Sequence, residues 1–190
     1  MDRKSGWMPH RAGARGFTLV ELMIAVLLLV IVLAVAAPPL RQLVHGNRLR
    51  TEASRLLRAL NLARSEAVLR NQPVSVCPSS MAQDGSARCG GEFARGWLVF
   101  SNADRDRIVD APGDSVIRAF AAIPAGYSLT NRAGTRAATD LITYLPDGSS
   151  RRSRTLLLCA PAGLGVASWS IVLNNVGRPR VARGEGACPS

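Results

Sequence analysis

An apolar run from Phe17 to Ala37, interrupted by a single acid, constrains this chain more than any other feature. As a helix at about 1.5 Å per residue the run is about 32 Å long. The hydrocarbon core of a bilayer is about 30 Å thick, so the sequence predicts a helix that crosses a membrane. The acid, Glu21, lies near the start of the run. Carboxylates in such segments are costly and normally have a partner, so Glu21 needs an explanation.

The leader before this run is basic, which orients the chain. Because positive residues stay on the cytoplasmic side, everything after Ala37 should face outward. Cleavage near Ala34-Val35-Ala36 would make the run an ordinary secretory signal peptide. Cleavage between Gly16 and Phe17 would instead keep the run and create an α-amino group at Phe17. That group can pair with the carboxylate of Glu21, on a neighbouring subunit or on the same one, so only the second scheme gives the acid a role.

The residues Gly16-Phe17-Thr18-Leu19-Val20-Glu21, followed by the apolar run and Pro38, resemble the class III leader of type IV pilins and type II secretion pseudopilins. The resemblance implies that residues 1–16 are a leader, which a prepilin peptidase removes after Gly16 before it methylates Phe17. It also implies that residues 17–37 form the transmembrane and assembly helix, and that Glu21 sets the register between subunits of a filament.

Residues 38–72 are predicted to continue this helix as an amphipathic segment. From Leu40 to Val68, apolar side chains recur three and four positions apart, and arginines fill much of the other face. Pro38 and Pro39 predict a kink where the two helical parts meet. Pro73 predicts the end of the helix, because proline disfavours helical geometry in the residue before it.

Residues 73–190 change to short β-type runs separated by turn residues, which predicts a β-rich head. We predict strands at Val74–Cys77, Trp97–Ser101, Val116–Phe120, Tyr127–Thr130, Leu141–Leu145, Thr155–Cys159, Trp169–Leu173 and Arg180–Ala182. Pro146-Asp147-Gly148 predicts one turn between strands, and Asn174-Asn175-Val176-Gly177 predicts another at the tip of a hairpin. The expected fold class is α+β, with a long kinked helix packed on an antiparallel sheet.

Four further segments narrow the resemblance to the FimT/GspH branch over roughly residues 16–183. They are Asn47-Arg48-Leu49, Leu60-Asn61-Leu62-Ala63-Arg64-Ser65-Glu66-Ala67, Val74 to Cys77, and Gly96-Trp97-Leu98-Val99-Phe100. Members of this branch are minor pilins or minor pseudopilins with a helix and a β-rich head. The resemblance therefore implies a type IV pilin-like fold.

The four cysteines, at positions 77, 89, 159 and 188, all lie in the region expected to face outward. An even number in that setting predicts two disulfides. Zinc is the alternative, but it is disfavoured because no C-x-x-C pair is present. Four cysteines allow three pairings, and proximity along the chain favours Cys77–Cys89 and Cys159–Cys188.

We expect no catalytic site, no metal and no cofactor. Removal of the leader would leave His45 as the only histidine, which gives poor support to a Ser-His-Asp arrangement. A spacing loosely like that of a calcium loop is found at Asn102, Asp104, Asp106 and Asp110. However, Arg107 occupies the position of the required glycine and Gly113 that of the closing glutamate, so a solvated loop is expected.

Arginine dominates the charge of the chain, which has 24 Lys+Arg against 13 Asp+Glu and a formal net charge of +11. This excess fits an anionic partner such as nucleic acid or lipid headgroups, or the arginine bias of a GC-rich genome. Near the end of the chain it concentrates after the two predicted turns, at Arg151, Arg152, Arg154, Arg178, Arg180 and Arg183. If the turns are neighbours, these planar side chains form one basic patch suited to phosphates; the alternative is a pair of solvated turns.

Gly177-Arg178-Pro179-Arg180 resembles the G-R-x-R motif of FimT pilins, which bind DNA during natural transformation. The resemblance implies a minor type IV pilin that binds double-stranded DNA without sequence preference through the six arginines. Its other partners would be the pilins of the filament, the prepilin peptidase and the inner membrane. It would be a single-pass inner-membrane protein with a periplasmic head before assembly, and part of a pilus at the cell surface afterwards.

Two other functions are compatible with parts of the sequence. The same leader, helix and fold suit a minor pilin or type II secretion pseudopilin that acts only in filament assembly and priming. An anchored periplasmic hydrolase is the third hypothesis, and the single remaining histidine, His45, opposes it.

Overall fold

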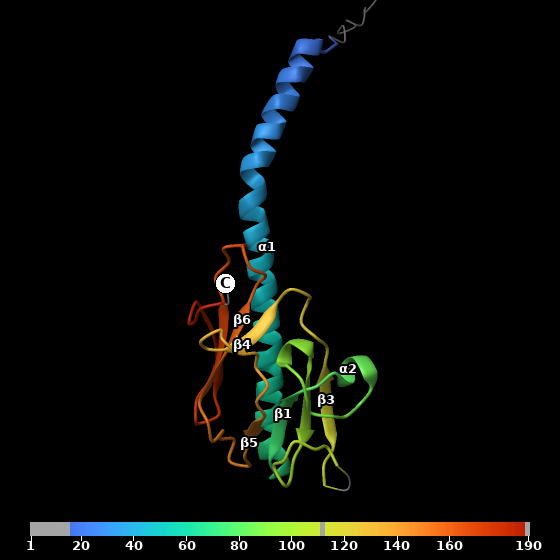
Figure 1. Ribbon diagram of the computed structural model, residues 1–190, viewed down its shortest axis with the longest axis vertical. Coiled ribbons are helices and arrows are strands. Elements are labelled where there is room, and N and C mark those ends of the chain that lie inside the picture. The colour runs from blue at the N-terminus through green and yellow to red at the C-terminus, as the bar shows by residue number, and fades with distance from the viewer. Residues whose placement is uncertain (1–15, 111–112, 189–190) are drawn as a thin grey trace, which may run out of the picture. The chain divides into compact units, whose positions relative to one another are not determined.

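The computed structural model describes residues 16–110 and 113–188, apart from the side chains of residues 35–39 (Figure 1). The predicted leader therefore lies outside the described residues except for Gly16. The chain divides into two compact units, Met1–Leu40 and Arg41–Ser190. The second unit contains every strand found among the described residues.

Helix α1 (Leu19–Arg70) begins in the first unit with a capped end. The hydroxyl oxygen of Thr18 accepts a hydrogen bond from the backbone N–H of Glu21 at 3.2 Å. Thr18 and Glu21 thus occupy the N-cap and third helical positions of a capping pattern, where an acid also favours the positive end of the helix dipole. Glu21 therefore has a local structural role at the start of the helix, whatever else it does.

The large apolar side chains from Leu19 to Leu33 are exposed. Among the described residues, no helix is both long enough and apolar enough to cross a membrane. The membrane crossing expected over residues 17–37 stays a prediction from the sequence. A kink was predicted at Pro38 and Pro39. The side chains of these two prolines are not described, and the kink stays a prediction from the sequence.

In the second unit, α1 contributes one buried face to the core. Its buried apolar residues are Leu49, Ala53, Leu56, Ala59, Leu60, Ala63 and Ala67. The alanines let strands approach the helix closely, and burial of each leucine side chain contributes about 2 kcal/mol. The buried face is shorter than predicted, because more than half of the surface of Leu40, Leu43, Val44 and Val68 is exposed.

Helix α1 ends at Arg70, close to the end predicted from Pro73. Asn71 has a left-handed backbone, with φ of 51°, and its N–H bonds to the carbonyl oxygen of Val68 at 3.4 Å. The N–H of Gln72 bonds to the carbonyl oxygen of Ala67 at 3.3 Å. These two bonds form a Schellman cap, which satisfies carbonyl groups that the helix itself leaves free.

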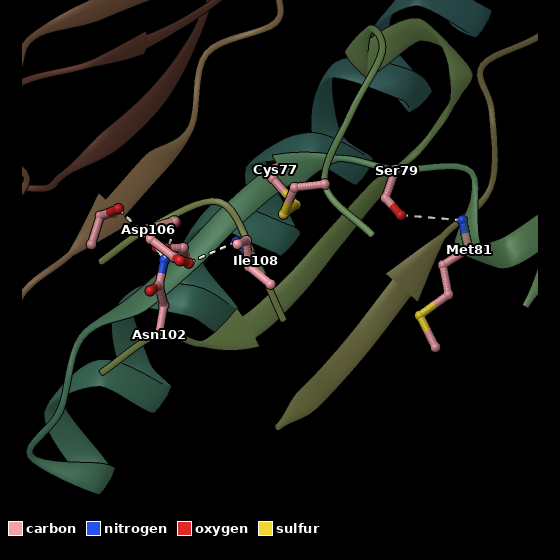
Figure 2. The surroundings of a disulfide bond; sticks show 9 residues. Cys77, Ser79, Met81, Asn102, Asp106 and Ile108 are labelled. Atoms are coloured by element: carbon pink, nitrogen blue, oxygen red, sulfur yellow. Dashed lines mark hydrogen bonds between the residues drawn. A yellow bond between two sulfur atoms is a disulfide. The ribbon is translucent and has the colours of Figure 1, made fainter. Parts of the chain in front are cut away.

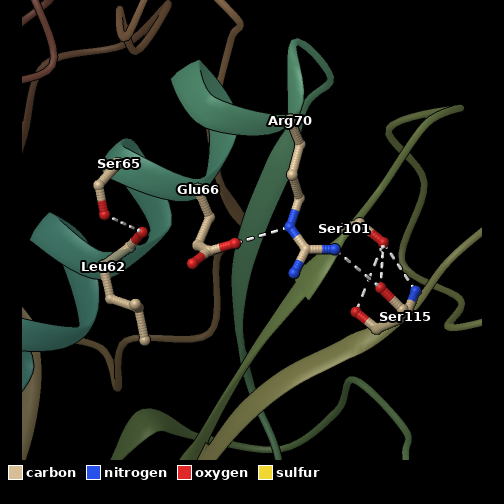
Figure 3. A network of polar contacts seen from close by, with 6 residues as sticks. All are labelled: Leu62, Ser65, Glu66, Arg70, Ser101 and Ser115. Atoms are coloured by element: carbon tan, nitrogen blue, oxygen red, sulfur yellow. Dashed lines mark hydrogen bonds and ion pairs between the residues drawn. The ribbon is translucent and has the colours of Figure 1, made fainter.

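The side chain of Arg70 fixes this helix end to the strands (Figure 3). Its Nε lies 2.6 Å from Oε2 of Glu66 one turn earlier, and its Nη1 donates to the hydroxyl of Ser115 at 3.4 Å. Ser115 in turn bonds to Ser101 through its N–H, at 2.7 Å from the Ser101 hydroxyl. The helix terminus, the end of one strand and the start of the next are therefore joined by one polar network.

The strands form two four-stranded antiparallel sheets rather than the single sheet that was predicted. The first has the order β3-β2-β1-β5 and comprises β1 (Val74–Pro78), β2 (Trp97–Ser101), β3 (Val116–Phe120) and β5 (Ile142–Tyr144). The second has the order β4-β6-β7-β8 and comprises β4 (Ser128–Asn131), β6 (Arg154–Cys159), β7 (Trp169–Leu173) and β8 (Pro179–Arg183). All eight predicted strands are present, each within one residue of its predicted bounds. The short helices α2 (Met81–Asp84) and η1 (Phe93–Arg95) lie between β1 and β2.

Both sheets contribute to the same core as α1. Trp97 and Tyr144 from the first sheet are fully buried, as are Leu158 and Ile171 from the second. The sheets thus cover the part of α1 that lies in the second unit (Figure 1). The other face of the first sheet is closed by a smaller cluster around Leu98.

The four cysteines form two disulfides, Cys77–Cys89 and Cys159–Cys188, with Cα–Cα distances of 5.5 Å and 5.7 Å. This is the pairing predicted from proximity along the chain. The first disulfide holds the segment after α2 to strand β1 (Figure 2). The second holds the carboxyl-terminal tail to the end of β6.

Candidate functional site

Two turns, at residues 145–150 and 174–178, carry most of the predicted site. In the first, the N–H of Gly148 donates to the carbonyl oxygen of Leu145 at 2.8 Å. In the second, the N–H of Gly177 donates to the carbonyl oxygen of Asn174 at 2.9 Å. Gly148 and Gly177 have φ of 75° and 76°, in the left-handed region that glycine adopts without strain. In each turn, glycine therefore occupies the position that closes the turn with a left-handed backbone.

The two turns pack against each other, backbone on backbone. A Cβ at Gly177 would lie 2.0 Å from the carbonyl oxygen of Gly148. The N–H of Ser150 donates to the carbonyl oxygen of Asn175 at 3.1 Å, and the hydroxyl of Ser153 hydrogen-bonds to the side-chain oxygen of Asn175. The turns are thus neighbours, which was the condition for a joint basic site. The first turn connects the two sheets, since β5 pairs with β1 and not with β6.

Helix α1 holds this pair of turns in place. Nε of Arg64 donates to the carbonyl oxygen of Gly148 at 2.9 Å. Hydrogen bonds from Ser149 to the carboxylate of Asp147 fix the first turn, and they lower the pKa of Asp147. The backbone from which these arginines project is therefore held in place by hydrogen bonds.

Arg178, Arg180 and Arg183, here called the turn arginines, all have exposed side chains. The N–H of Arg178 donates to the side-chain oxygen of Asn174 at 2.8 Å, and the ring of Pro179 fixes the next φ angle. The guanidinium of Arg180 lies 3.1 Å and 3.4 Å from the two carboxylate oxygens of Glu185. Since such exposed pairs contribute only about 0–1 kcal/mol, a phosphate can displace Glu185 at little cost.

Strand register separates Arg154 from Arg180. Leu173 of β7 lies opposite both Arg154 and Pro179, whereas Val172 lies opposite both Thr155 and Arg180. Directly opposed residues share a face of the sheet and consecutive residues alternate between faces. Arg154 and Arg180 therefore project from opposite faces. Arg183 lies opposite Trp169 and so shares the face of Arg154, which means that the six predicted arginines do not form one continuous patch.

Arg151, Arg152 and Arg154 line a hollow of about 450 Å³ beside β5, together with Arg105 and Arg107. These five side chains are here called the hollow arginines. Nη1 of Arg154 lies 2.8 Å from Oδ2 of Asp140; the Arg154 side chain is 18% exposed and that of Asp140 72%. Arg154 is thus largely packed and paired, whereas the side chains of Arg151 and Arg152 are exposed.

Arg105 and Arg107 line the hollow from a loop after β2. Polar side chains of this loop bind its own backbone, as Asn102 and Asp106 do in Figure 2. The buried amide of Asn102 donates to the carbonyl oxygen of Asp106 at 2.8 Å. The carboxylate of Asp106 accepts the N–H of Ile108 at 2.7 Å, and that of Asp104 accepts the N–H of Asp106 at 3.3 Å. The acids hold the loop, and the arginines that follow each of them line the hollow.

Sequence reasoning did not include Arg105 and Arg107 in the site. They lie more than 40 residues before Arg151, and nothing local indicates which strand end their loop will approach. The alternation of Asp and Arg over residues 104–107 was the available signal, because it separates the loop-forming side chains from the others.

Three acids of this loop region lie close together. Carboxylate oxygens of Asp104, Asp106 and Asp114 lie within 4.8 Å of one another. The third member is Asp114, which accepts the N–H of Ala103 at 3.1 Å and was not part of the calcium-loop spacing. Burial raises the pKa of Asp114, and the charge of Asp104 raises it further. Since all three accept a backbone N–H, the cluster is explained by loop formation.

His45, the one histidine considered for catalysis, contacts a tyrosine. Its Nδ1 lies 2.6 Å from the hydroxyl oxygen of Tyr127, and the ring centroids are 6.0 Å apart. This is a contact between α1 and the residue before β4, of the kind that packs a helix on a sheet.

Comparison with known families decides which class of protein carries this fold. The family described as type II transport protein GspH matches residues 52–177, well over half of the chain. The chain belongs to the GspH family. The prokaryotic N-terminal methylation motif matches residues 11–37, a segment that includes Gly16, Phe17 and Glu21. Both matches agree with the FimT/GspH resemblance, so this is a protein of the minor pilin and minor pseudopilin family.

Solved structures share the fold of this GspH-family chain. Pseudomonas aeruginosa type IV minor pilin FimU, in one crystal form, matches with a TM-score of 0.55 and 19% identity, over 76% of this chain and 95% of FimU. A second crystal form of FimU matches with a TM-score of 0.51 and 17% identity, over 74% and 98% of the two chains. The Vibrio cholerae type 2 secretion minor pseudopilin EpsH matches with a TM-score of 0.44 and 17% identity, over 70% of this chain and 95% of EpsH. No curated protein matches the chain. The FimU matches confirm the type IV pilin-like α+β fold.

The residues expected to be processed lie at the start of the described chain. Gly16 is exposed, and the Phe17 side chain is 80% exposed. Glu21 lies in the first turn of α1. The motif and these positions are consistent with prepilin processing of this GspH-family protein.

Proposed function

We propose that this GspH-family chain is a minor type IV pilin that joins a filament through the amino-terminal part of α1 and binds extracellular duplex DNA through its head. The observation that carries the DNA part is the exposed position of Arg178, Arg180 and Arg183 on a hairpin whose turn is braced against a second arginine-bearing turn. In this proposal the protein is a structural and binding subunit, not an enzyme.

The amino-terminal segment supports incorporation into a filament. Cleavage after Gly16 by a prepilin peptidase and methylation of Phe17 would expose the apolar helix for packing. The exposed side chains from Leu19 to Leu33 offer a surface that neighbouring pilins can cover. The new amino group at Phe17 would pair with Glu21 of a neighbour and set the register. Before assembly, this segment would hold the subunit at the inner membrane with the head in the periplasm.

The chemistry of the turn arginines supports a phosphate backbone as the ligand. Guanidinium groups bond phosphate oxygens in pairs, and the braced turn lowers the conformational entropy lost on binding. Around the turn, the acid that contacts an arginine is Glu185, and its exposed pair with Arg180 is weak. These contacts address phosphates rather than base edges, so binding would be independent of sequence.

The competing function is assembly alone, in a pilus or in a type II secretion pseudopilus. The observation that favours it is the family match itself, since the matching family is described as a type II transport protein. In that case the apolar helix and Glu21 would carry the function, and the turn arginines would be replaceable.

A complementation experiment in the native host separates these functions. The gene would be deleted and replaced by wild type, Arg178→Ala/Arg180→Ala, or the control Arg50→Ala/Arg88→Ala, which removes the same charge from positions elsewhere in the head unit. Incorporation into filaments and uptake of labelled duplex DNA into a nuclease-protected state would be measured. We expect all three proteins to enter filaments and the turn variant alone to lose DNA uptake, by at least about tenfold. Uptake equal to wild type would leave assembly as the function.

A further inference from the structure

The hollow beside β5 brings together arginines from two segments that are distant in sequence. Arg105 and Arg107 come from the loop after β2, Arg151 and Arg152 from the segment before β6, and Arg154 from the first position of β6. Among the described residues that line it, Asp140 is the only acid. Like charges do not gather without a cost, so an opening with five guanidinium groups and one carboxylate is suited to an anion.

We propose that this hollow is a second phosphate-binding site that holds the backbone of the DNA bound by the turn arginines; the inference rests on the proposed function. Its volume of about 450 Å³ lies within the range of about 300–1,000 Å³ that is usual for ligand sites. Arginine forks inside such a concave surface present several N–H donors to one phosphate group.

The ion pair at the rim of the hollow prepares it for an anion. Arg154 is mostly covered and is held by Asp140 at 2.8 Å, so it forms a fixed part of the wall. Arg105, Arg107, Arg151 and Arg152 are exposed and remain to contact a ligand. Four exposed arginines therefore surround the pair that the largely covered Arg154 forms with the exposed Asp140.

The neighbouring acids do not cancel this charge at contact range. The carboxylates of Asp104 and Asp106 accept N–H groups of their own loop, at 3.3 Å and 2.7 Å. Arg105, between them, has a left-handed backbone with φ of 65°, which a residue with a side chain adopts only at a cost. The loop is thus held in a conformation in which the acids serve its backbone while Arg105 and Arg107 line the hollow.

The backbone between the two arginine groups is continuous. Ser150 and Ser153, which flank Arg151 and Arg152, both hydrogen-bond to Asn175 in the turn before Arg178. The segment 150–153 therefore connects the turn before Arg178 to the hollow, and a DNA strand that contacts Arg178 would follow this segment around the end of the sheet. Contact with both groups adds phosphates to the interface without any base-specific contact.

The test uses the full chain in non-ionic detergent, with duplex DNA and inorganic tripolyphosphate as separate probes. The variants are Arg105→Ala/Arg107→Ala in the hollow, Arg178→Ala/Arg180→Ala in the turn, and Arg50→Ala/Arg88→Ala as the charge-matched control, each checked for an unchanged melting temperature. Asp140→Asn is added because it removes the one carboxylate of the hollow without removing an arginine.

We expect the hollow variant to lose tripolyphosphate binding, to bind DNA about tenfold more weakly, and to show a salt slope smaller by about 1.8, the loss of two phosphate contacts. Asp140→Asn should strengthen both interactions. If the hollow variant binds both probes as the control does while the turn variant loses DNA, the hollow site is wrong and the proposed function stands. Wild type could instead bind tripolyphosphate through Arg105 and Arg107 but bind no DNA. The proposed function would then be wrong, and the phosphate bound in the hollow would not come from DNA. If wild type binds neither probe, both proposals are wrong.

Discussion

A β-carbon on Gly177 would lie 2.0 Å from the carbonyl oxygen of Gly148. No real side chain tolerates that distance, so the two turns fit together only because position 177 is glycine. The turn that precedes Arg178 is thereby placed against the turn that precedes Arg151, and α1 supports both through Arg64. The position of the arginines thus depends on a backbone contact.

Replacement of Gly177 by alanine should separate the turns and destabilise the head. Left-handed φ alone costs an alanine about 1–2 kcal/mol, and the displaced Gly148 backbone adds to this. Gly184→Ala is the matched control, because Gly184 has the same φ of 76° but no neighbouring atom within 4 Å of where its β-carbon would lie. We expect the Gly177 variant to melt about 4–8 °C below the control, for an added cost of about 2 kcal/mol. Equal melting temperatures would show that the turns do not depend on this contact.

Removal of the carboxylate of Glu185 should strengthen DNA binding. Glu185 occupies the guanidinium of Arg180 at 3.1 Å, and a phosphate must displace it. Glu185→Gln should raise the affinity for duplex DNA about three- to fivefold at low salt, because an exposed pair contributes up to about 1 kcal/mol. Glu66→Gln is the control, since it breaks the Arg70 pair near the end of α1. An equal gain in both variants would indicate a general charge effect, and no gain would remove Glu185 from the interface.

The two disulfides should stabilise the head to different extents. They join residues 29 and 12 positions apart, and longer closed loops are stabilised more. Cys159→Ala/Cys188→Ala should lower the free energy of unfolding by about 3.5 kcal/mol, and Cys77→Ala/Cys89→Ala by about 3 kcal/mol. Thermal melting of the oxidised wild type beside both variants measures this. Melting temperatures that match wild type would mean that the bonds contribute nothing to the stability of the head.

The stability of the head should depend on pH through Glu52. This residue is 8% exposed, and burial raises its pKa above 4.5, although Arg55 partly opposes the shift. Because the pKa of Glu52 is higher in the folded state than in the unfolded state, the folded state is more stable when Glu52 is protonated. Its contribution is complete below about pH 4.5 and is lost as the pH rises through the folded-state pKa.

Chemical unfolding of wild type and Glu52→Gln across this pH range tests the sign of the effect. The variant, which cannot ionise, should gain stability relative to wild type as the pH rises from about 4 to 7. A variant that instead loses stability relative to wild type over that range would show that the ion pair with Arg55, at 3.1 Å, outweighs the burial of the charge.

The local structure of this chain was predictable because its signals are local. Strands such as Trp97–Ser101 are β-type runs bounded by turn residues, and the end of α1 follows from Pro73. The pairing of strands was not predictable in the same way. β1 pairs with β5 across more than 60 residues, and no local pattern states that β4 joins the other sheet. Two sheets therefore replaced the expected one.

The candidate site shows the same division. The two turns and their arginines were found from Pro146-Asp147-Gly148 and Asn174-Asn175-Val176-Gly177, because turn residues are local signals. The opposite faces of Arg154 and Arg180 follow from strand register, and the pairs with Asp140 and Glu185 follow from tertiary placement. Arg105 was missed for the same reason, since its loop meets β6 only in the folded head.

The most direct test of the DNA-binding claim is a titration of the full chain with duplex DNA in non-ionic detergent at several salt concentrations. Contact with about four phosphates predicts a fall in affinity of roughly 150-fold between about 50 and 200 mM salt. Arg178→Ala/Arg180→Ala should bind at least about tenfold more weakly and with a shallower salt dependence, whereas Arg50→Ala/Arg88→Ala, with the same net charge, should bind nearly as wild type does. The absence of binding at low salt, or equal binding by the two double variants, would contradict the account and leave an assembly subunit.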